Sequence, residues 1–275
     1  MIATAIATIT VVSTASAHDF WIVPDLFAVA GGSTAHINGR AGTRFPAGSA
    51  VQPDRVADAR IIGAAGQMKI TQMSVEGGSL RLHQKPAAAG QYLVAVGLTP
   101  RVTRSTSAGL LRFLRAEGGS AEAARLERDN VLAGLDSVVF NSASYASTVI
   151  QYGRGGPSAF SMTAGYPLEF VPVNNPTHLH VGDTLHVMVM GAGKPVAGIG
   201  LDATPAADTS APLVAGAPST SLALIADAKG VVHLPLGKAG LWLLRSAFVS
   251  RKAGGNPNDF EVARSTYVFS VGAKH

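Results

Sequence analysis

The stretch GQYLVAV, residues 90–96, is the clearest β-strand in the amino-acid sequence. It begins with glycine and then combines aromatic, β-branched and other apolar residues, a composition that favours an extended chain. Other runs of this kind, separated by glycine and proline, precede it in the sequence. They lie at residues 29–41, 60–63, 66–73 and 79–83. The chain up to residue 96 is therefore predicted to form β-structure.

A second series of strand patterns begins near residue 166. About seven short strands with turn residues between them are typical of an immunoglobulin-like or prealbumin-like β-sandwich. The runs are residues 168–173, 184–190, 194–203, 227–236, 240–245 and 266–271. The segment 202–221 is rich in Ala, Pro, Thr and Ser, and its composition predicts a loop.

Residues 106–135 have a different periodicity. Their leucine, phenylalanine and valine residues recur at helical spacing, and the pair Gly118-Gly119 interrupts the pattern. Arginine, glutamate and aspartate lie on the polar side. We expect two helices inserted within or after the first sheet domain. Because their sequence has no catalytic spacing, they are interpreted as a packing or partner surface.

These patterns together predict a mostly β protein of two immunoglobulin-like or prealbumin-like β-sandwich units with a helical insertion. The predicted N-terminal β domain spans residues 18–152 and contains the insertion at about 106–135. The predicted C-terminal β-sandwich domain spans residues 160–275. Residues 153–157, which are rich in glycine, are the expected linker.

The first 17 residues predict a signal peptide. They contain no charged side chain and end in Ala15-Ser16-Ala17, the small-residue pattern that precedes a signal-peptidase cleavage site. Cleavage there would make His18 the first residue of the mature chain. No other stretch reaches the length of a membrane span, so the mature protein is expected to be periplasmic or secreted and not membrane-spanning.

Composition restricts the chemistry that the chain can perform. Cysteine is absent, which excludes disulfides, thiolate metal sites and cysteine nucleophiles. The net charge of +5 is spread along the sequence without a basic run, so a nucleic-acid partner is not expected. Nucleophile elbows, zinc-protease helices and phosphate-binding loops are also absent from the sequence. We therefore predict no catalytic residues and a protein that is not an enzyme.

His18 is the first candidate metal ligand. A histidine with a free α-amine binds a metal through both the amine and the imidazole, and one further imidazole completes a histidine brace, which suits copper. His36 or His83 could supply that imidazole, and the sequence leaves the choice open. Asp19 could orient the His18 ring as an outer-shell carboxylate. The alternative is that His18 is only an incidental first residue.

A second group of histidines is followed by methionines, and all of them occupy even-numbered positions between residues 178 and 190. On one continuous strand these side chains would share a face that suits soft Cu(I), although Gly182-Asp183 interrupts the pattern. An ordinary half-buried strand explains the same alternation. His233 and His275 belong to no group of candidate ligands in the sequence. The members of the group are His178, His180, His186, Met188 and Met190.

Four ordered blocks of the sequence resemble one protein family. They are HDFWIVP at residues 18–24, RFLRAEG at 112–118, YPLEFVP at 166–172 with Asn-Pro at 175–176, and Asp227-x-x-Gly230 with PL at 235–236 and GLW at 240–242. These blocks are similar to those of the domain-of-unknown-function family 4198. The resemblance implies a NikM-like periplasmic protein linked to nickel or cobalt uptake.

The sequence and the resemblance together predict an exported metal-binding protein. It would bind one transition-metal ion, nickel, cobalt or copper, and deliver it to a membrane transporter or receptor. The alternative function is a non-enzymatic interaction module that binds a partner protein or carbohydrate. A redox enzyme built on a copper brace is the third and least favoured interpretation.

Overall fold

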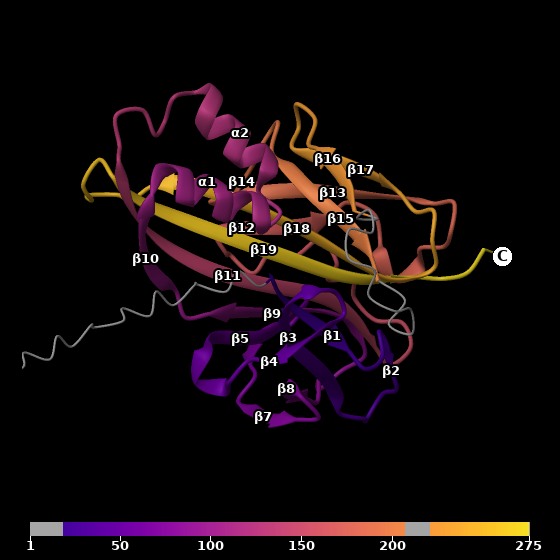
Figure 1. The fold of residues 1–275 in the computed structure, drawn as a ribbon. Coiled ribbons are helices and arrows are strands. Elements are labelled where there is room, and N and C mark those ends of the chain that lie inside the picture. The colour runs from indigo at the N-terminus through magenta and orange to yellow at the C-terminus, as the bar shows by residue number, and fades with distance from the viewer. Residues whose placement is uncertain (1–18, 207–220, 275) are drawn as a thin grey trace, which may run out of the picture.

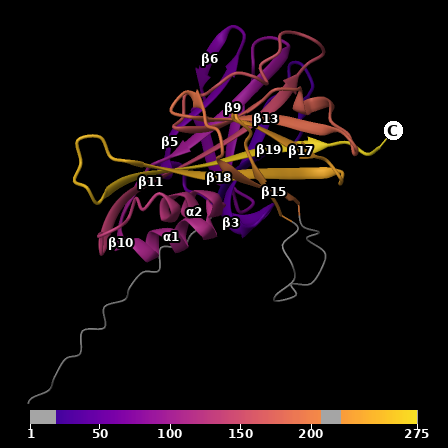
Figure 2. The same ribbon diagram turned by 90° about the horizontal axis from the view of Figure 1, so that it is seen from above.

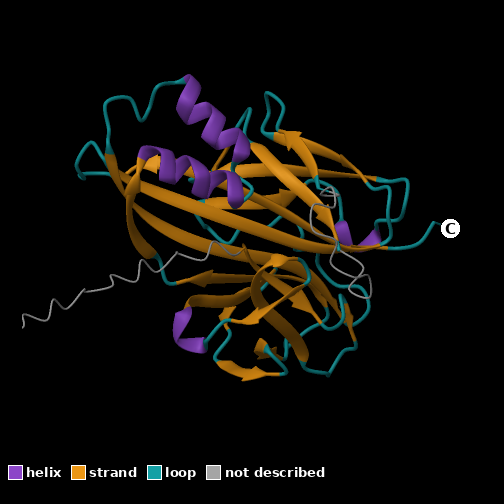
Figure 3. Cartoon of the chain, in the orientation of Figure 1, coloured by secondary structure: helices purple, strands orange, loops and turns teal. Residues whose placement is uncertain are grey.

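The computed structural model describes residues 19–206 and 221–274, and this part of the chain is mostly β-structure (Figures 1 and 3). The predicted signal peptide at residues 1–17, the predicted first residue His18 and His275 lie outside the described residues. Within the described ranges, no helix is long and apolar enough to cross a membrane.

A ten-stranded sheet forms the centre of the fold. Its strands run in the order β16-β15-β18-β19-β11-β9-β5-β6, and β2 and β10 also pair with β11. Strand β11 pairs in parallel with β19 and with β2, whereas its pairing with β9 and the pairing of β18 with β19 are antiparallel. The bounds are β2 (Ala28–Val29), β5 (Val56–Gly63), β6 (Gly66–Lys69), β9 (Gly90–Leu98), β10 (Arg101–Thr106), β11 (Ser137–Tyr152), β15 (Gly200–Pro205), β16 (Leu222–Ile225), β18 (Gly240–Arg251) and β19 (Asp259–Val271).

A five-stranded sheet packs against the β5, β9 and β11 part of the central sheet, below it in Figure 1. The strands run in the order β1-β3-β8-β7, and β4 pairs with β3. Alternate residues of β3, such as Ala35 and Ile37, face the shared core, and the residues between them face outward. The bounds are β1 (Asp19–Pro24), β3 (Ala35–Arg44), β4 (Ala47–Ala50), β7 (Gln72–Glu76) and β8 (Ser79–Gln84), and the short 3-10 helix η1 (Pro53–Arg55) follows β4.

A four-stranded sheet packs against the other part of the central sheet. Strand β13 alternates strictly between core residues and outward residues, and Leu185, Val187 and Val189 contact the core around Trp242 and Tyr267. The bounds are β12 (Leu168–Pro172), β13 (Thr184–Gly191), β14 (Lys194–Pro195) and β17 (Val231–Pro235), and the 3-10 helix η2 (Pro176–His178) lies between β12 and β13.

Strand β9, which contains the stretch 90–96, belongs to both packed cores. Leu93 and Ala95 contact the core of the four-stranded sheet, whereas Val94 and Val96 contact the core of the five-stranded sheet. Because successive side chains of a strand point to opposite faces, a strand buried on both faces needs apolar residues at every position. This requirement explains the unbroken apolar sequence of residues 92–96.

Two helices lie within the predicted insertion, between β10 and β11. Thr106 begins the first helix, since its side chain accepts a hydrogen bond from the Gly109 backbone N–H. Leu110, Leu114 and Leu126 are buried in a core shared with residues of β11, β18 and β19. The two helices lie over these strands (Figures 1 and 2). The helices are α1 (Ser107–Ala116) and α2 (Ser120–Arg128). Two helices thus lie within residues 106–135, and each buries apolar side chains against the sheet.

The two predicted domain ranges contribute to the same central sheet. The register of β11 and β19 joins Val139 to Asp259 and continues without a break to Thr148 and Val268. A side-chain hydrogen bond also joins the two ranges, because the Thr266 hydroxyl donates to the Phe20 carbonyl at 2.6 Å. The described chain thus has β-sandwich packing on two parts of one shared sheet.

The expected linker at residues 153–157 is hydrogen-bonded to its surroundings. The Gly153 N–H donates to the Val29 carbonyl, and the Pro157 carbonyl accepts from the Gln91 N–H, each at 2.8 Å. Gly156 has φ +87°, and a Cβ atom there would lie 2.3 Å from the Ala89 carbonyl oxygen. This segment therefore packs closely against the start of β9.

We expect Gly156→Ala to lower the free energy of unfolding by about 2–3 kcal/mol, because it adds a backbone clash to the strain of a positive φ. Gly155→Ala is the matched control, since Gly155 has φ +68° and open space around its Cα. The control should lose only about 1 kcal/mol. Urea denaturation measures both losses, and equal losses would show that the close packing is unimportant.

Candidate metal centre

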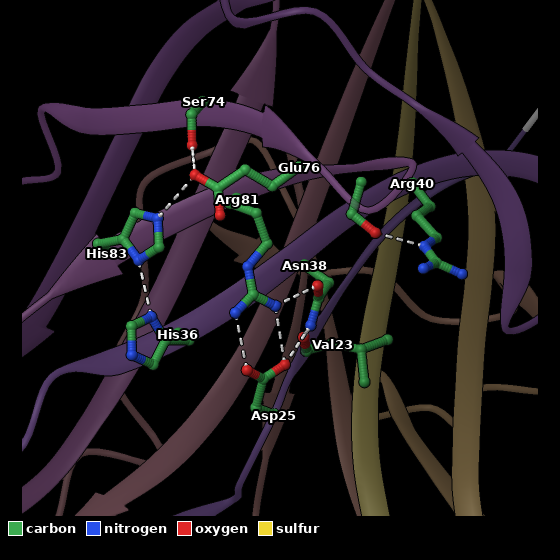
Figure 4. A network of polar contacts seen from close by, with 10 residues as sticks. Val23, Asp25, His36, Asn38, Arg40, Ser74, Glu76, Arg81 and His83 are labelled. Atoms are coloured by element: carbon green, nitrogen blue, oxygen red, sulfur yellow. Dashed lines mark hydrogen bonds and ion pairs between the residues drawn. The ribbon is translucent and has the colours of Figure 1, made fainter.

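His36 and His83 face each other across two neighbouring strands. The Nδ1 atoms of the two rings are 2.7 Å apart, and the rings are nearly perpendicular at 82° (Figure 4). At this distance one imidazole N–H donates to the other ring nitrogen, and the tautomers decide which ring donates. The structure therefore brings together two of the three metal ligands that the sequence predicts.

Strand register explains why these two rings meet. His36 of β3 is directly opposite His83 of β8 in the antiparallel ladder. Ala35, Ile37 and Leu82 point into the core, so the alternation leaves both histidines half-buried on the outer face of the five-stranded sheet. The backbone ladder holds the Cα atoms of both histidines in place.

A carboxylate lies on the far side of the His83 ring. Glu76 Oε1, from β7, is 3.9 Å from His83 Nε2 and accepts a hydrogen bond from the Ser74 hydroxyl (Figure 4). A carboxylate near the second ring nitrogen is the usual arrangement around a metal-binding histidine, because it fixes the ring orientation and raises its basicity.

A second carboxylate near His36 is already paired. Arg81 donates to both Asp25 oxygens, at 3.0 and 2.9 Å, and Asn38 donates to the same carboxylate at 2.6 Å. The Arg81 hydrogen bonds are the main cause that lowers the pKa of Asp25. Asp25 is thus a negative charge beside the histidine pair that is already bound by other side chains.

Asp19, the predicted outer-shell residue, lies far from the histidine pair. It is opposite Gly42 in the ladder of β1 and β3, six positions from His36, which corresponds to about 20 Å along the strand. Its carboxylate accepts a hydrogen bond from Arg245 at 2.7 Å. The predicted relation of Asp19 to His18 cannot be described, because His18 is outside the described residues.

Asp19 belongs to a largely buried ion network instead. Arg245 also contacts Asp202 at 3.3 Å, and nearby Arg264 forms an ion pair with Glu117. Burial raises the pKa of Asp202 and of Glu117, and the arginines oppose that rise. The network joins the beginning of β1 to β15, β18, β19 and the end of α1.

A second cross-strand histidine pair lies on the four-stranded sheet. His186 of β13 is opposite His233 of β17, and their Nδ1 atoms are 2.6 Å apart. Asp227 Oδ2 is 3.5 Å from His233 Nε2, which repeats the place of Glu76 in the first pair. The partners are 47 residues apart in the sequence in both pairs. Sequence analysis missed His233, and this repeated spacing is the signal that points to it.

The predicted soft-metal face is only partly assembled. His186, Met188 and Met190 share the outer side of β13, as their parity predicts. His178 and His180 precede the strand, and His180 forms a bridge with Gly272. The turn at Gly182 interrupts the parity, so these two residues are not part of the strand face.

Comparison with known protein families identifies the family of this chain. A sequence profile described as "Domain of unknown function (DUF4198)" matches residues 15–249. The chain belongs to the DUF4198 family. The match includes both histidine pairs, and no curated protein matches the chain.

Solved structures show only distant likeness to this DUF4198 chain. Salmonella alpha-2-macroglobulin reacted with methylamine is 14% identical, with a TM-score of 0.24, over 92% of this chain and 15% of that one. Murine CEACAM1b is 9% identical, with a TM-score of 0.21, over 93% and 100%. The mouse nectin-like molecule 4 ectodomain is 12% identical, with a TM-score of 0.18, over 92% and 63%. Likeness at this level says nothing about function.

The described part of the DUF4198 chain holds no group of three or more His, Cys, Asp or Glu residues placed to bind one metal ion. Each histidine pair therefore offers two imidazole nitrogens, with a carboxylate near the outer nitrogen of one ring. Water or another molecule would have to complete the coordination of a metal bound there.

Proposed function

We propose that this DUF4198 protein is exported and binds a late transition-metal ion, nickel, cobalt or copper, between His36 and His83. The facing Nδ1 atoms of these two residues carry the proposal. Imidazole is a preferred ligand of these metals, and the strand ladder fixes the two rings before a metal arrives.

The geometry requires only a small adjustment to accept a metal. Two nitrogens bound at about 2.0–2.1 Å to a tetrahedral ion are about 3.3 Å apart. Their separation here is 2.7 Å, so small side-chain rotations open the pair when the metal replaces the shared proton. Glu76 then orients the His83 ring through its outer nitrogen.

Two protein ligands suit a site that transfers its metal. Open coordination positions let a side chain of a receiving protein enter before the histidines release the ion. This behaviour agrees with delivery to a membrane transporter or receptor, as the NikM-like resemblance implies. Export rests on the signal peptide expected at residues 1–17. The pair His186 and His233 is proposed as a second site, to which Met188 adds a soft ligand.

Calorimetric titration of the exported protein with Ni²⁺, Co²⁺ and Cu²⁺ tests the proposal. We expect the His36→Ala/His83→Ala variant to have one site fewer than the wild-type protein. Each single substitution should weaken its site by at least about 10-fold, because one of two ligands is lost. The mass of the same protein should correspond to a chain that begins at residue 18.

His178→Ala is the matched control. It removes an exposed histidine that belongs to neither pair, so its titration should equal that of the wild-type protein. If the wild-type protein binds none of the three metals, or if the variant without His36 and His83 binds them equally well, the proposal is wrong. The interaction-module alternative would then be the better interpretation.

A further inference from the structure

A cavity of about 390 Å³ lies at the junction of the five-stranded sheet, α1 and the central sheet. This volume is within the range of small-molecule sites in proteins. The cavity is lined by residues of β1, β3, β4, β10, β11, β19 and α1, and neither histidine pair contributes to it.

One wall of the cavity is polar and comes from one face of the central sheet. Arg101 of β10 is opposite Ser142 of β11, and Ser144 of β11 is opposite Arg264 of β19. Residues two positions apart on a strand share a face, so the ladder places these four side chains together. The lining also has an apolar part, which includes Phe20, Leu98 and Phe113.

The charge of the lining is positive. Arg55, Arg101 and Arg264 line the cavity, and no carboxylate does. Arg264 forms an ion pair with Glu117, and Arg55 donates a hydrogen bond to the Thr99 carbonyl. Arg101 forms no ion pair within residues 19–206 and 221–274. Burial and the nearby charge of Arg101 lower the pKa of Arg55. Arg55 and Arg101 thus bring two positive charges to the same cavity, and the two charges repel each other.

A buried hydroxyl faces the same space. Ser142 is 8% exposed, and its Oγ atom has no hydrogen-bond partner in the described chain. Buried polar groups almost always have a partner, because leaving one unsatisfied costs about 1–3 kcal/mol. An anionic oxygen in the cavity would accept the Ser142 hydrogen and neutralise the neighbouring guanidinium groups.

We propose that this cavity binds a small organic anion. Its carboxylate accepts hydrogen bonds from Arg55, Arg101 and Ser142, and its apolar body packs against Phe20 and Phe113. Guanidinium groups bind a carboxylate, and aromatic rings bind an apolar group. The cavity therefore favours an amphipathic carboxylate over an inorganic anion. This site is separate from the proposed metal site and does not depend on it.

Calorimetric titration of the metal-free protein with phenylacetate and 3-phenylpropionate tests this proposal, with phenylacetamide and 3-phenylpropanamide as neutral probes of the same shape. We expect the carboxylates to bind and the amides to bind at least about 10-fold more weakly, since a charged hydrogen bond is lost. Arg101→Gln and Ser142→Ala should each weaken carboxylate binding by about 10-fold.

Arg104→Gln is the matched control, because it removes the same charge from the other face of β10. It should bind the carboxylates as the wild-type protein does, and so should the His36→Ala/His83→Ala variant. The proposal is overturned if neither carboxylate binds, if the amides bind equally well, or if Arg101→Gln has no effect. A failure of metal binding leaves this result unchanged, so the two proposals are tested separately.

Discussion

Residues 160–275 expressed alone are expected not to fold. In the intact chain β19 lies between β18 and β11, and the separated fragment loses the whole ladder from Asp259 to Val268. It also loses core residues that belong to the other range, including Leu93 and Val149. Such a fragment exposes a long apolar strand edge, which favours aggregation over a stable fold.

The measurement is circular dichroism and amide NMR of the fragment 160–275, alone and co-expressed with residues 19–159. We expect a poorly dispersed spectrum and no cooperative melting for the isolated fragment. The co-expressed pair should recover the spectrum of the intact chain, since the cut lies outside every strand. Cooperative unfolding of the isolated fragment would instead establish the C-terminal range as an independent domain.

Arg245→Met is expected to lower the free energy of unfolding by about 2–4 kcal/mol. Breaking a buried ion pair by removing one partner usually costs about 3–5 kcal/mol, and the 23% exposure of Arg245 reduces that cost. The substitution leaves Asp19 and Asp202, whose carboxylates are 9% and 19% exposed, without their arginine. Methionine keeps the apolar stem of the side chain, so the loss reports the charge.

The destabilisation should depend on pH. Burial already raises the pKa of Asp202, and the loss of Arg245 raises it further. A carboxyl whose pKa is higher in the folded than in the unfolded protein destabilises the fold as pH rises through that pKa. The loss measured by urea denaturation should therefore be greater at about pH 7.5 than at about pH 4.5.

Two controls separate the ion network from a general loss of charge. Arg112→Met removes an exposed arginine of α1 and should change the stability by less than about 0.5 kcal/mol. Adding Asp19→Asn to Arg245→Met should restore part of the lost stability, because one buried charge is then removed. A loss that is independent of pH and unaffected by Asp19→Asn would contradict the electrostatic explanation.

Both helices and many of the strands were predicted from the sequence, whereas β10 and β11 were not. The stretch 90–96 lies within β9, and both helices lie inside residues 106–135. These features depend on local periodicity, which the sequence displays directly. The shared sheet could not be predicted in this way, because the pairing of β11 with β19 joins segments 120 residues apart.

The candidate metal site was only partly predictable. The chemistry of imidazole identified His36 and His83, but their contact depends on the register of β3 and β8. His233 was missed because the sequence around it contains no other ligand, and only the pairing of β13 with β17 brings it to His186. Asp19, which was expected to orient His18, accepts a hydrogen bond from Arg245.

The sequence by itself determined the two helices, many of the strands and which residue types can bind a metal. The continuous apolar character of residues 92–96 required a strand buried on both faces, since side chains alternate along a strand. Only the tertiary structure decided that these two faces belong to two cores joined by one sheet. It also decided which histidines meet, because strand register depends on long-range packing that no local pattern encodes.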